Sequence, residues 1–206
     1  AGAKQFNGGQ ACISPDYVFI KEDQKTRLVE GFKATVAQNL YDENGQIKKD
    51  SIAQIVNEAN FNRVKALFDD AVAQGATVAV GGQMDATDLT IHPTLLTDVT
   101  PQMKILQEEI FAPVLPVMTY DTLDQVIGYI EARDKPLALY MYSNDDANVD
   151  KVLSHTSSGG VTINGVFSHY LENRLPFGGV NQSGTGSYHG YFGFKAFSHE
   201  RAVYLH

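Results

Sequence analysis

The only cysteine of this 206-residue chain is Cys12, and the residues around it are unusual for an inert thiol. Gly8 and Gly9 precede it, and Pro15 ends any helix that the segment could form. Because glycine tolerates close backbone approach and unusual φ values, such a segment can present a nucleophile with its own amide available to an oxyanion. The other interpretation is a buried, unreactive thiol, which is the commonest state of a lone cysteine.

Two known cysteine signatures do not match this segment. The caspase signature shares Gln10-Ala11-Cys12 but continues differently, and its histidine lies upstream, where this chain has none. A nucleophile elbow needs glycine two residues before and after the nucleophile, and Gln10 and Ser14 stand there. Two hypotheses stay open: a cysteine hydrolase or acyltransferase, which needs a histidine base near Cys12, and a non-catalytic α/β binding domain, which slow alkylation of Cys12 would favour.

A second candidate is the acidic pair Glu108-Glu109, which is followed by an aromatic residue, Phe111, and then by a strand-like run. One carboxylate could accept hydrogen bonds from ribose hydroxyls while the aromatic ring packs on a cofactor ring. A solvated acidic turn is the other interpretation, since charged pairs are usually exposed. The spacing of these residues does not decide between the two.

The glycine-rich segment from Leu175 to Gly190 does not fit a phosphate loop. Its Gly184-Thr185-Gly186 with Gly190 is one residue out of register for the dinucleotide fingerprint, and no strand precedes it directly. The six histidines have no metal-ligand spacing, so we expect no metal site. A single cysteine also excludes an internal disulfide and a multi-cysteine zinc site.

Strand-like and helical patterns alternate along the chain, which is typical of an α/β fold. We expect strands at 17–20, 77–80, 114–120, 137–142 and 160–163, and helices at 22–40, 57–74, 122–132 and from Asn144 or Asp145 to His155. Thr122 and Gln125 form a capping-box pattern, and Gly75 supplies a C-cap. This order predicts a mainly parallel sheet covered by helices on both faces, with a site at the carboxyl ends of the strands and an ordered functional loop at 165–197.

The charge and hydropathy of the chain exclude several classes of partner. Sixteen basic and 24 acidic residues give a formal net charge of −8, which argues against binding to nucleic acid or to an anionic membrane. No apolar run approaches the ~20 residues of a membrane span, and the first residues lack the apolar stretch of a signal peptide. We therefore expect a cytoplasmic protein.

Three motifs, taken together, resemble the catalytic domain of the aldehyde dehydrogenase superfamily. The family's Asn-x-Gly-Gln-x-Cys stands at 7–12, its Glu-Glu-Ile-Phe-Gly-Pro-Val at 108–114 with Ala112 in place of the glycine, and its Pro-Phe-Gly-Gly-x-x-x-Ser-Gly at 176–184. The order is that of the family, and the match covers essentially the whole chain. The ending from Gly186 to Arg201 looks most like the class 3 branch, which includes fatty, aromatic and coniferyl aldehyde dehydrogenases.

This resemblance implies NAD- or NADP-dependent oxidation of an aldehyde to a carboxylic acid. A thiolate at Cys12 would attack the aldehyde as a thiohemiacetal, and a thioester would follow hydride transfer. Glu109 would hold the nicotinamide ribose, and Phe111 would pack near that end of the cofactor. Asn164 would support the substrate site, and Phe177 would line the aldehyde funnel. If the family's glycine needs a positive φ, Ala112 would shift Phe111.

The resemblance also implies that part of the enzyme is missing, because only eleven residues precede Cys12. We expect residues 1–206 to be a single catalytic domain without its upstream dinucleotide-binding domain, which would bind most of the NAD or NADP. The family's general base and oxyanion-hole asparagine also lie upstream, so we expect this fragment to be inactive alone. The expected partners are a small aldehyde, that upstream domain, and further copies of the intact enzyme in a homo-oligomer, with no nucleic acid and no membrane.

Overall fold

The computed structural model describes residues 1–44, 46–48 and 51–206. The chain divides into two compact units, Ala1–Asp121 (unit 1) and Thr122–His206 (unit 2), and each is described by itself. The assignment of residues 1–206 to a single catalytic domain stays a prediction.

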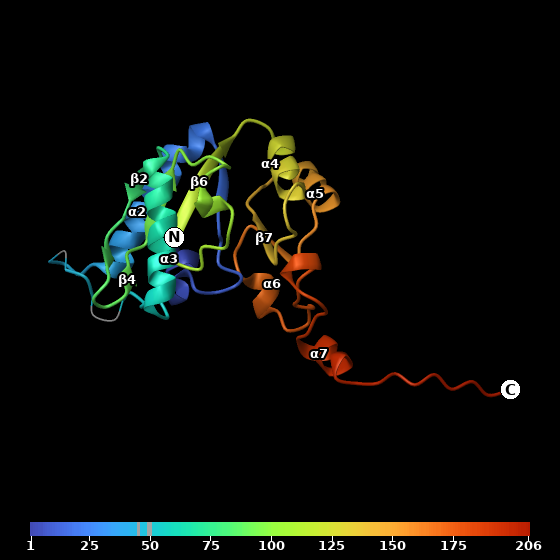
Figure 1. Cartoon of the computed structure of the whole chain (residues 1–206). Coiled ribbons are helices and arrows are strands. Elements are labelled where there is room, and N and C mark those ends of the chain that lie inside the picture. The colour runs from blue at the N-terminus through green and yellow to red at the C-terminus, as the bar shows by residue number, and fades with distance from the viewer. Residues whose placement is uncertain (45, 49–50) are drawn as a thin grey trace. The chain divides into compact units, whose positions relative to one another are not determined.

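Unit 1 contains the N-terminal helical turns and most of the strands (Figure 1). Its elements are α1 (Gly2–Gln5), η1 (Phe6–Gly9), β1 (Val18–Lys21), η2 (Glu22–Gln24), α2 (Lys25–Leu40), α3 (Glu58–Ala73), β2 (Thr77–Val80), β3 (Met84–Asp85), β4 (Thr90–Ile91), β5 (Thr94–Thr97), η3 (Lys104–Leu106) and β6 (Val114–Tyr120). Here η denotes a 3₁₀ helix.

Unit 2 combines one pair of strands with helices. Its elements are α4 (Leu123–Glu131), β7 (Ala138–Met141), α5 (Asp146–His155), β8 (Gly160–Ile163), α6 (Ser168–Leu171), η4 (Asn181–Ser183) and α7 (Gly190–Ala196). After α7 the chain continues to its C-terminus without a further helix or strand (Figure 1). In the part of the chain that is described, no helix is long and apolar enough to span a membrane.

The strands pair mainly in parallel, as the sequence predicts. The four-stranded sheet of unit 1 has the order β1-β6-β5-β2, in which β6 lies parallel to both β1 and β5. β2 is antiparallel to β5 at the edge, and β3 and β4 form a short antiparallel pair. In unit 2, β7 and β8 are parallel. The α/β class with a mainly parallel sheet is therefore confirmed.

Both faces of the sheet in unit 1 are buried. On one face, helix α2 packs against β5 and β6 through Phe32, Val36, Leu40, Leu95, Leu115 and Val117. Since side chains alternate along a strand, Val114 and Leu96 point to the opposite face, and both are fully buried. In unit 2, Ile127, Leu139 and Val152 form the core between α4, α5 and the strands. These cores fix the loops at the strand ends.

The predicted helix ends are largely confirmed by their caps. The Asn57 side chain accepts a hydrogen bond from the Asn60 amide at the start of α3, and Gly75 follows that helix with a φ of +103°. Thr122 and Gln125 form the predicted capping box of α4. The Asp145 side chain caps α5.

Strand β5, and with it the antiparallel edge of the sheet, is not predicted by the sequence pattern. All four residues of β5 are buried, so the strand has no alternation of polar and apolar side chains, and it begins directly after Pro93. The chain runs from β2 through β3 and β4 to β5 without an intervening helix. The prediction that strands and helices alternate was therefore wrong for this segment. The segment 165–197 contains the short elements α6, η4 and α7.

Candidate active site

The Cys12 thiol is exposed, at the end of a loop with an unusual backbone. Asn7, Gly8 and Gly9 have φ values of 48°, 61° and 72°, three consecutive residues in the left-handed region. The Ser14 amide then donates to the Ala11 carbonyl at 2.8 Å, which closes a turn around Cys12. The interpretation of a buried thiol is therefore wrong for this chain, and the predicted glycine-based presentation is what the backbone shows.

The side chain of Gln10 ties this loop to a distant segment. Its Nε2 donates to the Gln54 carbonyl at 2.9 Å, and its Oε1 accepts from the Val56 amide at 2.9 Å. The Asn7 side chain donates to the Gln10 carbonyl at 2.9 Å. Both amide side chains of the Asn-x-Gly-Gln-x-Cys motif thus bond to backbone and hold the loop in place, a role that the sequence analysis did not assign to them.

The cysteine motif and the Glu108–Val114 motif touch each other at Gly9. A Cβ at Gly9 would collide with the carbonyl oxygen of Ala112, so only glycine permits this approach. Ala112 is fully buried and does not have a positive φ, whereas Phe111 has a φ of 51°. The replacement of the family's glycine by Ala112 is therefore accommodated without the strain that we considered.

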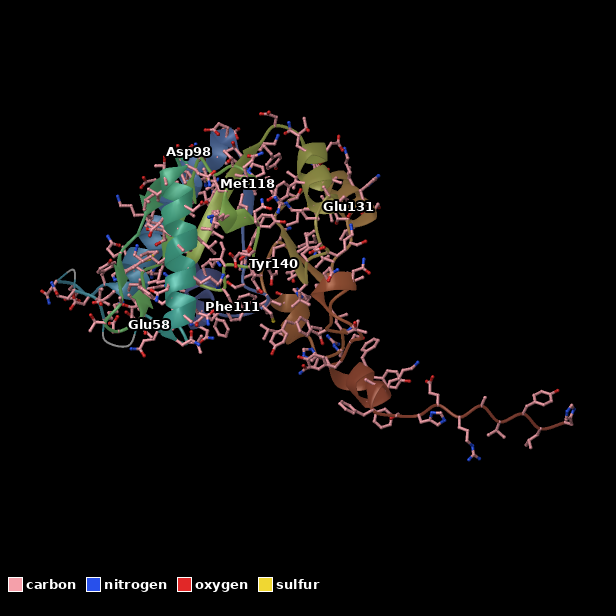
Figure 2. All side chains as sticks on the ribbon, viewed as in Figure 1. Glu58, Asp98, Phe111, Met118, Glu131 and Tyr140 are labelled. Carbon is pink, nitrogen blue, oxygen red and sulfur yellow. The ribbon has the colours of Figure 1, made fainter. Side chains whose placement is uncertain are left out.

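Glu109 and Phe111 are exposed next to this contact. The Phe111 ring is 38% exposed and labelled in Figure 2. Burial and the charge of Asp16 raise the pKa of Glu109, whereas Lys4 and Arg63 act in the opposite direction. Glu109 and Phe111 stand two positions apart in this motif, and a role of either in cofactor binding stays a prediction.

A cluster of charged side chains, not predicted from the sequence, acts on Glu109. Lys4 is 2% exposed, and burial lowers its pKa to about 8, although the charges of Asp16 and Glu109 act to raise it. Burial raises the pKa of Asp16, opposed mainly by Lys4. Arg63 of α3 pairs with the Glu108 carboxylate at 3.3 Å. No spacing could reveal Arg63, because its partner is 45 residues away.

In unit 2, Asn164 follows β8 with a φ of 55°, and its side chain bonds to backbone. Its Oδ1 accepts from the Ser143 amide at 2.9 Å, and its Nδ2 donates to the Ser143 carbonyl at 2.9 Å. Its own amide donates to the Met141 carbonyl at 2.7 Å. Asn164 thus joins the ends of β7 and β8, and a role in substrate binding stays a prediction.

Phe177 is only 7% exposed and is part of an aromatic cluster in unit 2. Its ring centroid lies 4.9 Å from that of Tyr170, 5.4 Å from His189 and 5.8 Å from Tyr188. Its amide also donates to the Tyr188 carbonyl, and the Tyr188 amide donates back. In unit 2 Phe177 is therefore a packing residue, and its place in an aldehyde funnel stays a prediction.

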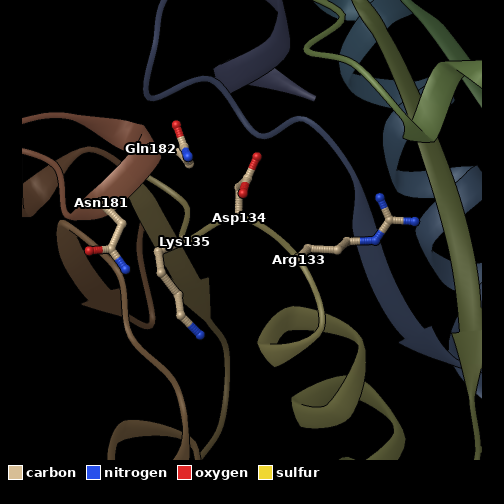
Figure 3. A pocket seen from close by; sticks show the side chains of 5 residues that line it. All are labelled: Arg133, Asp134, Lys135, Asn181 and Gln182. Carbon is tan, nitrogen blue, oxygen red and sulfur yellow. The ribbon is translucent and has the colours of Figure 1, made fainter.

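A surface hollow of about 450 Å³ lies elsewhere in unit 2 (Figure 3). Its lining is polar and consists of Arg133, Asp134, Lys135, Asn181 and Gln182. Lys135 is paired with Glu131 at 2.9 Å. None of the predicted site residues lines this hollow. Over residues 1–44, 46–48 and 51–206, no group of three or more His, Cys, Asp or Glu residues could hold a metal ion.

Comparison with known proteins identifies the family of this chain. The model of the Aldehyde dehydrogenase family matches residues 1–203. The chain belongs to the aldehyde dehydrogenase family. AldX of Bacillus subtilis is 52% identical over 205 residues, which are 100% of this chain and 46% of AldX. Aldehyde dehydrogenase family 3 member A2 of Mus musculus is 42% identical over 205 residues, 100% of this chain and 41% of that protein.

Solved structures agree with this assignment. The structure of Staphylococcus aureus AldH in its substrate-bound state aligns with a TM-score of 0.88 at 36% identity, over 100% of this chain and 45% of that one. The chain thus spans less than half the length of these aldehyde dehydrogenases. Other relatives are a probable coniferyl aldehyde dehydrogenase of Caulobacter vibrioides and a dimeric, NADP-preferring aldehyde dehydrogenase of Bos taurus. The predicted family and its class 3 and coniferyl branch are confirmed.

The three aldehyde dehydrogenase motifs divide between the two units. The cysteine motif and the Glu108–Val114 motif both belong to unit 1, where they meet through Gly9 and Ala112. The motif at 176–184 belongs to unit 2 together with Asn164.

Proposed function

We propose that this chain is the thiol-bearing catalytic part of an aldehyde dehydrogenase that uses NAD or NADP to oxidise an aldehyde to a carboxylic acid. The observation that carries the proposal is the exposed Cys12 on a loop that packs, through Gly9, against the segment bearing Glu109 and Phe111. A nucleophile and a cofactor-binding carboxylate must be held in fixed geometry for this reaction. Membership of the family and its fold support this assignment.

In the proposed reaction Cys12 supplies the nucleophile. As a thiolate, its sulfur attacks the aldehyde carbon, and the carbonyl oxygen becomes an oxyanion close to the backbone of the Cys12 turn. When bound, NAD or NADP would supply the hydride acceptor for this carbon. Water then hydrolyses the thioester on Cys12 and releases the acid. Activity further requires the general base and oxyanion donor that we expect upstream, so this chain alone should be inactive.

Glu109 and Phe111 are the residues of this chain that we assign to the cofactor. The Glu109 carboxylate would accept hydrogen bonds from the ribose hydroxyls, and Phe111 would pack against the same end of the cofactor. A relative named as NADP-preferring supports NADP as one of the two candidates. Most of the nucleotide would bind to the upstream domain. We further propose a cytoplasmic homo-oligomer, which is supported by the composition and by a relative named as dimeric.

The proposal is tested by Cys12→Ala in the longer enzyme that contains this chain. Loss of the covalent nucleophile should reduce aldehyde oxidation by far more than tenfold while nucleotide binding is retained, which fluorescence titration would measure. Retention of more than about a tenth of the wild-type turnover would contradict the assignment. Ester hydrolysis by the wild type that is equally fast with and without nucleotide, combined with no aldehyde oxidation, would favour a cysteine hydrolase instead.

A further inference from the structure

One peptide group in unit 1 is held at both of its polar ends by charged side chains. The peptide that joins Glu109 to Ile110 donates its N–H to Asp16 Oδ1 at 3.0 Å. Its carbonyl oxygen, that of Glu109, accepts from Arg63 Nη1 at 2.9 Å. A second nitrogen of the same guanidinium, Nη2, donates to the Ile110 carbonyl at 2.8 Å. We call Arg63 and Asp16, with the peptide between them, the peptide clamp.

The clamp joins three segments that are distant in the sequence. Arg63 comes from helix α3, and Asp16 comes from the chain four residues after Cys12. The peptide itself belongs to the Glu108–Val114 motif. Bonds from charged side chains to a peptide are shorter and stronger than neutral ones, so an acceptor and a donor of opposite charge fix the plane of this peptide.

The clamp lies within a group of charged side chains of both signs. Burial raises the pKa of Asp16, and the strongest opposing influence is the charge of Lys4, which is 2% exposed. Arg63 is also paired with the exposed Glu108 at 3.3 Å. Glu109 belongs to the same group, because the charges of Asp16, Lys4 and Arg63 all act on its pKa.

The orientation of this peptide constrains the direction of the Glu109 side chain. The peptide plane determines ψ of Glu109, and with it the direction in which the Glu109 side chain leaves the backbone. The N–H and C=O groups of peptides in exposed turns usually form hydrogen bonds with water. Those of this peptide form hydrogen bonds with side chains that are 46 and 94 residues away in the sequence. Both clamp residues act at the end of the motif that carries the exposed carboxylate, and one of them lies on the Cys12 segment.

We propose that Arg63 and Asp16 are positioning residues that aim Glu109 at the nicotinamide ribose and keep it in register with the Cys12 loop. This inference rests on the proposed function. It predicts that loss of the clamp weakens the use of nucleotide while leaving the capture of aldehyde by Cys12 unaffected.

The test compares Arg63→Met, Arg63→Lys and a matched control, Lys65→Met, in the longer enzyme that contains this chain. Lys65 lies on the same helix and pairs with Asp69, away from the clamp. Arg63→Met should raise KM for the nucleotide about tenfold or more, as expected for loss of bonds from a charged donor, with little change in KM for the aldehyde or in the alkylation rate of Cys12. Arg63→Lys retains the charge but not the two donor nitrogens of the guanidinium, so its KM for the nucleotide should rise less than that of Arg63→Met. Lys65→Met should behave as wild type.

A second measurement reports on the clamp independently of enzyme activity. Hydrogen exchange, followed by mass spectrometry on a peptide that covers residues 107–112, should be faster in Asp16→Ala than in the wild type, because the Ile110 amide loses its acceptor. Asp16→Asn keeps an oxygen acceptor without the charge and should lie between the two.

Two results would overturn the positioning role. One is an Arg63→Met enzyme whose nucleotide KM is unchanged; the other is a fall in kcat and melting temperature with both KM values unchanged, which would make Arg63 only a stabilising residue. Failure of the proposed function is distinct from both. In that case the wild type itself would oxidise no aldehyde with NAD or NADP, and the positioning role would fail with it, even if the exchange data showed the clamp intact.

Discussion

The candidate residues of the two units are held in opposite ways. In unit 1, Cys12, Glu109 and Phe111 are exposed, and their segments are held by backbone contacts and by the partly buried side chains of Asp16 and Arg63. In unit 2, Phe177 is itself buried among aromatic rings, and the side chain of Asn164 is bonded to the Ser143 backbone. Groups that meet a substrate must be accessible, whereas buried groups act first through packing. Mutations in the two units should therefore differ in whether they reduce activity or stability first.

The largest effect is expected at Gly9 in unit 1. Gly9→Ala would place a Cβ against the Ala112 carbonyl at a φ of +72°, so we expect a loss of more than ~4 kcal/mol in the free energy of unfolding, or no folded protein. Gly31→Ala is the matched control, because Gly31 lies in α2 with open space around it and should gain ~0.5–1 kcal/mol. Urea denaturation measures both variants, and a wild-type-like Gly9→Ala would refute the close contact.

A pair of phenylalanine variants compares the two units directly. Phe177→Ala should lower the free energy of unfolding by ~3 kcal/mol, because it empties the centre of the aromatic cluster in unit 2. Phe111→Ala in unit 1 should cost less than ~1 kcal/mol, since its ring is 38% exposed, but should raise KM for the nucleotide in the longer enzyme. If the two variants had equal effects on stability, the contrast between the units would be lost.

The smallest effect concerns the pH dependence of unit 2. Burial lowers the pKa of His169, whose Nδ1 lies 2.8 Å from Thr162 Oγ1. Because the pKa of His169 is lower in the folded chain than in the unfolded chain, the unfolded chain binds more protons below pH ~6.5. Stability should therefore fall as the pH drops below that value, by at most ~1.4 kcal/mol per pH unit. Urea denaturation at pH 7.5 and 5.5 should show this loss in the wild type and in His155→Gln, where the exposed His155 is changed. His169→Gln should show a smaller loss, and an equal loss would assign it to other groups.

Much of the fold follows from local sequence signals. The capping box at Thr122 and Gln125, the glycine after α3 and the start of α5 at Asp145 are local features, and the structure contains them as predicted. Strand β5 could not be predicted in this way, because its four buried residues show no alternation and its position depends on pairing with β2 and β6.

The candidate site, like the fold, could be predicted only where the signal lies close together in the sequence. The glycines before Cys12 indicate an exposed thiol, and the structure contains one. The clamp residues Arg63 and Asp16 could not be found from spacing, because each is defined by a partner far away in the chain. The burial of Phe177 likewise depends on Tyr188 and His189, which return to it through a turn.

Trapping of the covalent intermediate would show whether Cys12 is the nucleophile of an aldehyde dehydrogenase. The longer enzyme that contains this chain would be mixed with aldehyde and nucleotide, quenched in acid within one turnover, and digested for mass spectrometry. We expect an acyl group on the peptide that carries Cys12, which forms only with nucleotide and is absent from Cys12→Ala. Aldehyde oxidation that proceeds with no acyl group on Cys12, or with the acyl group on another residue, would contradict this expectation.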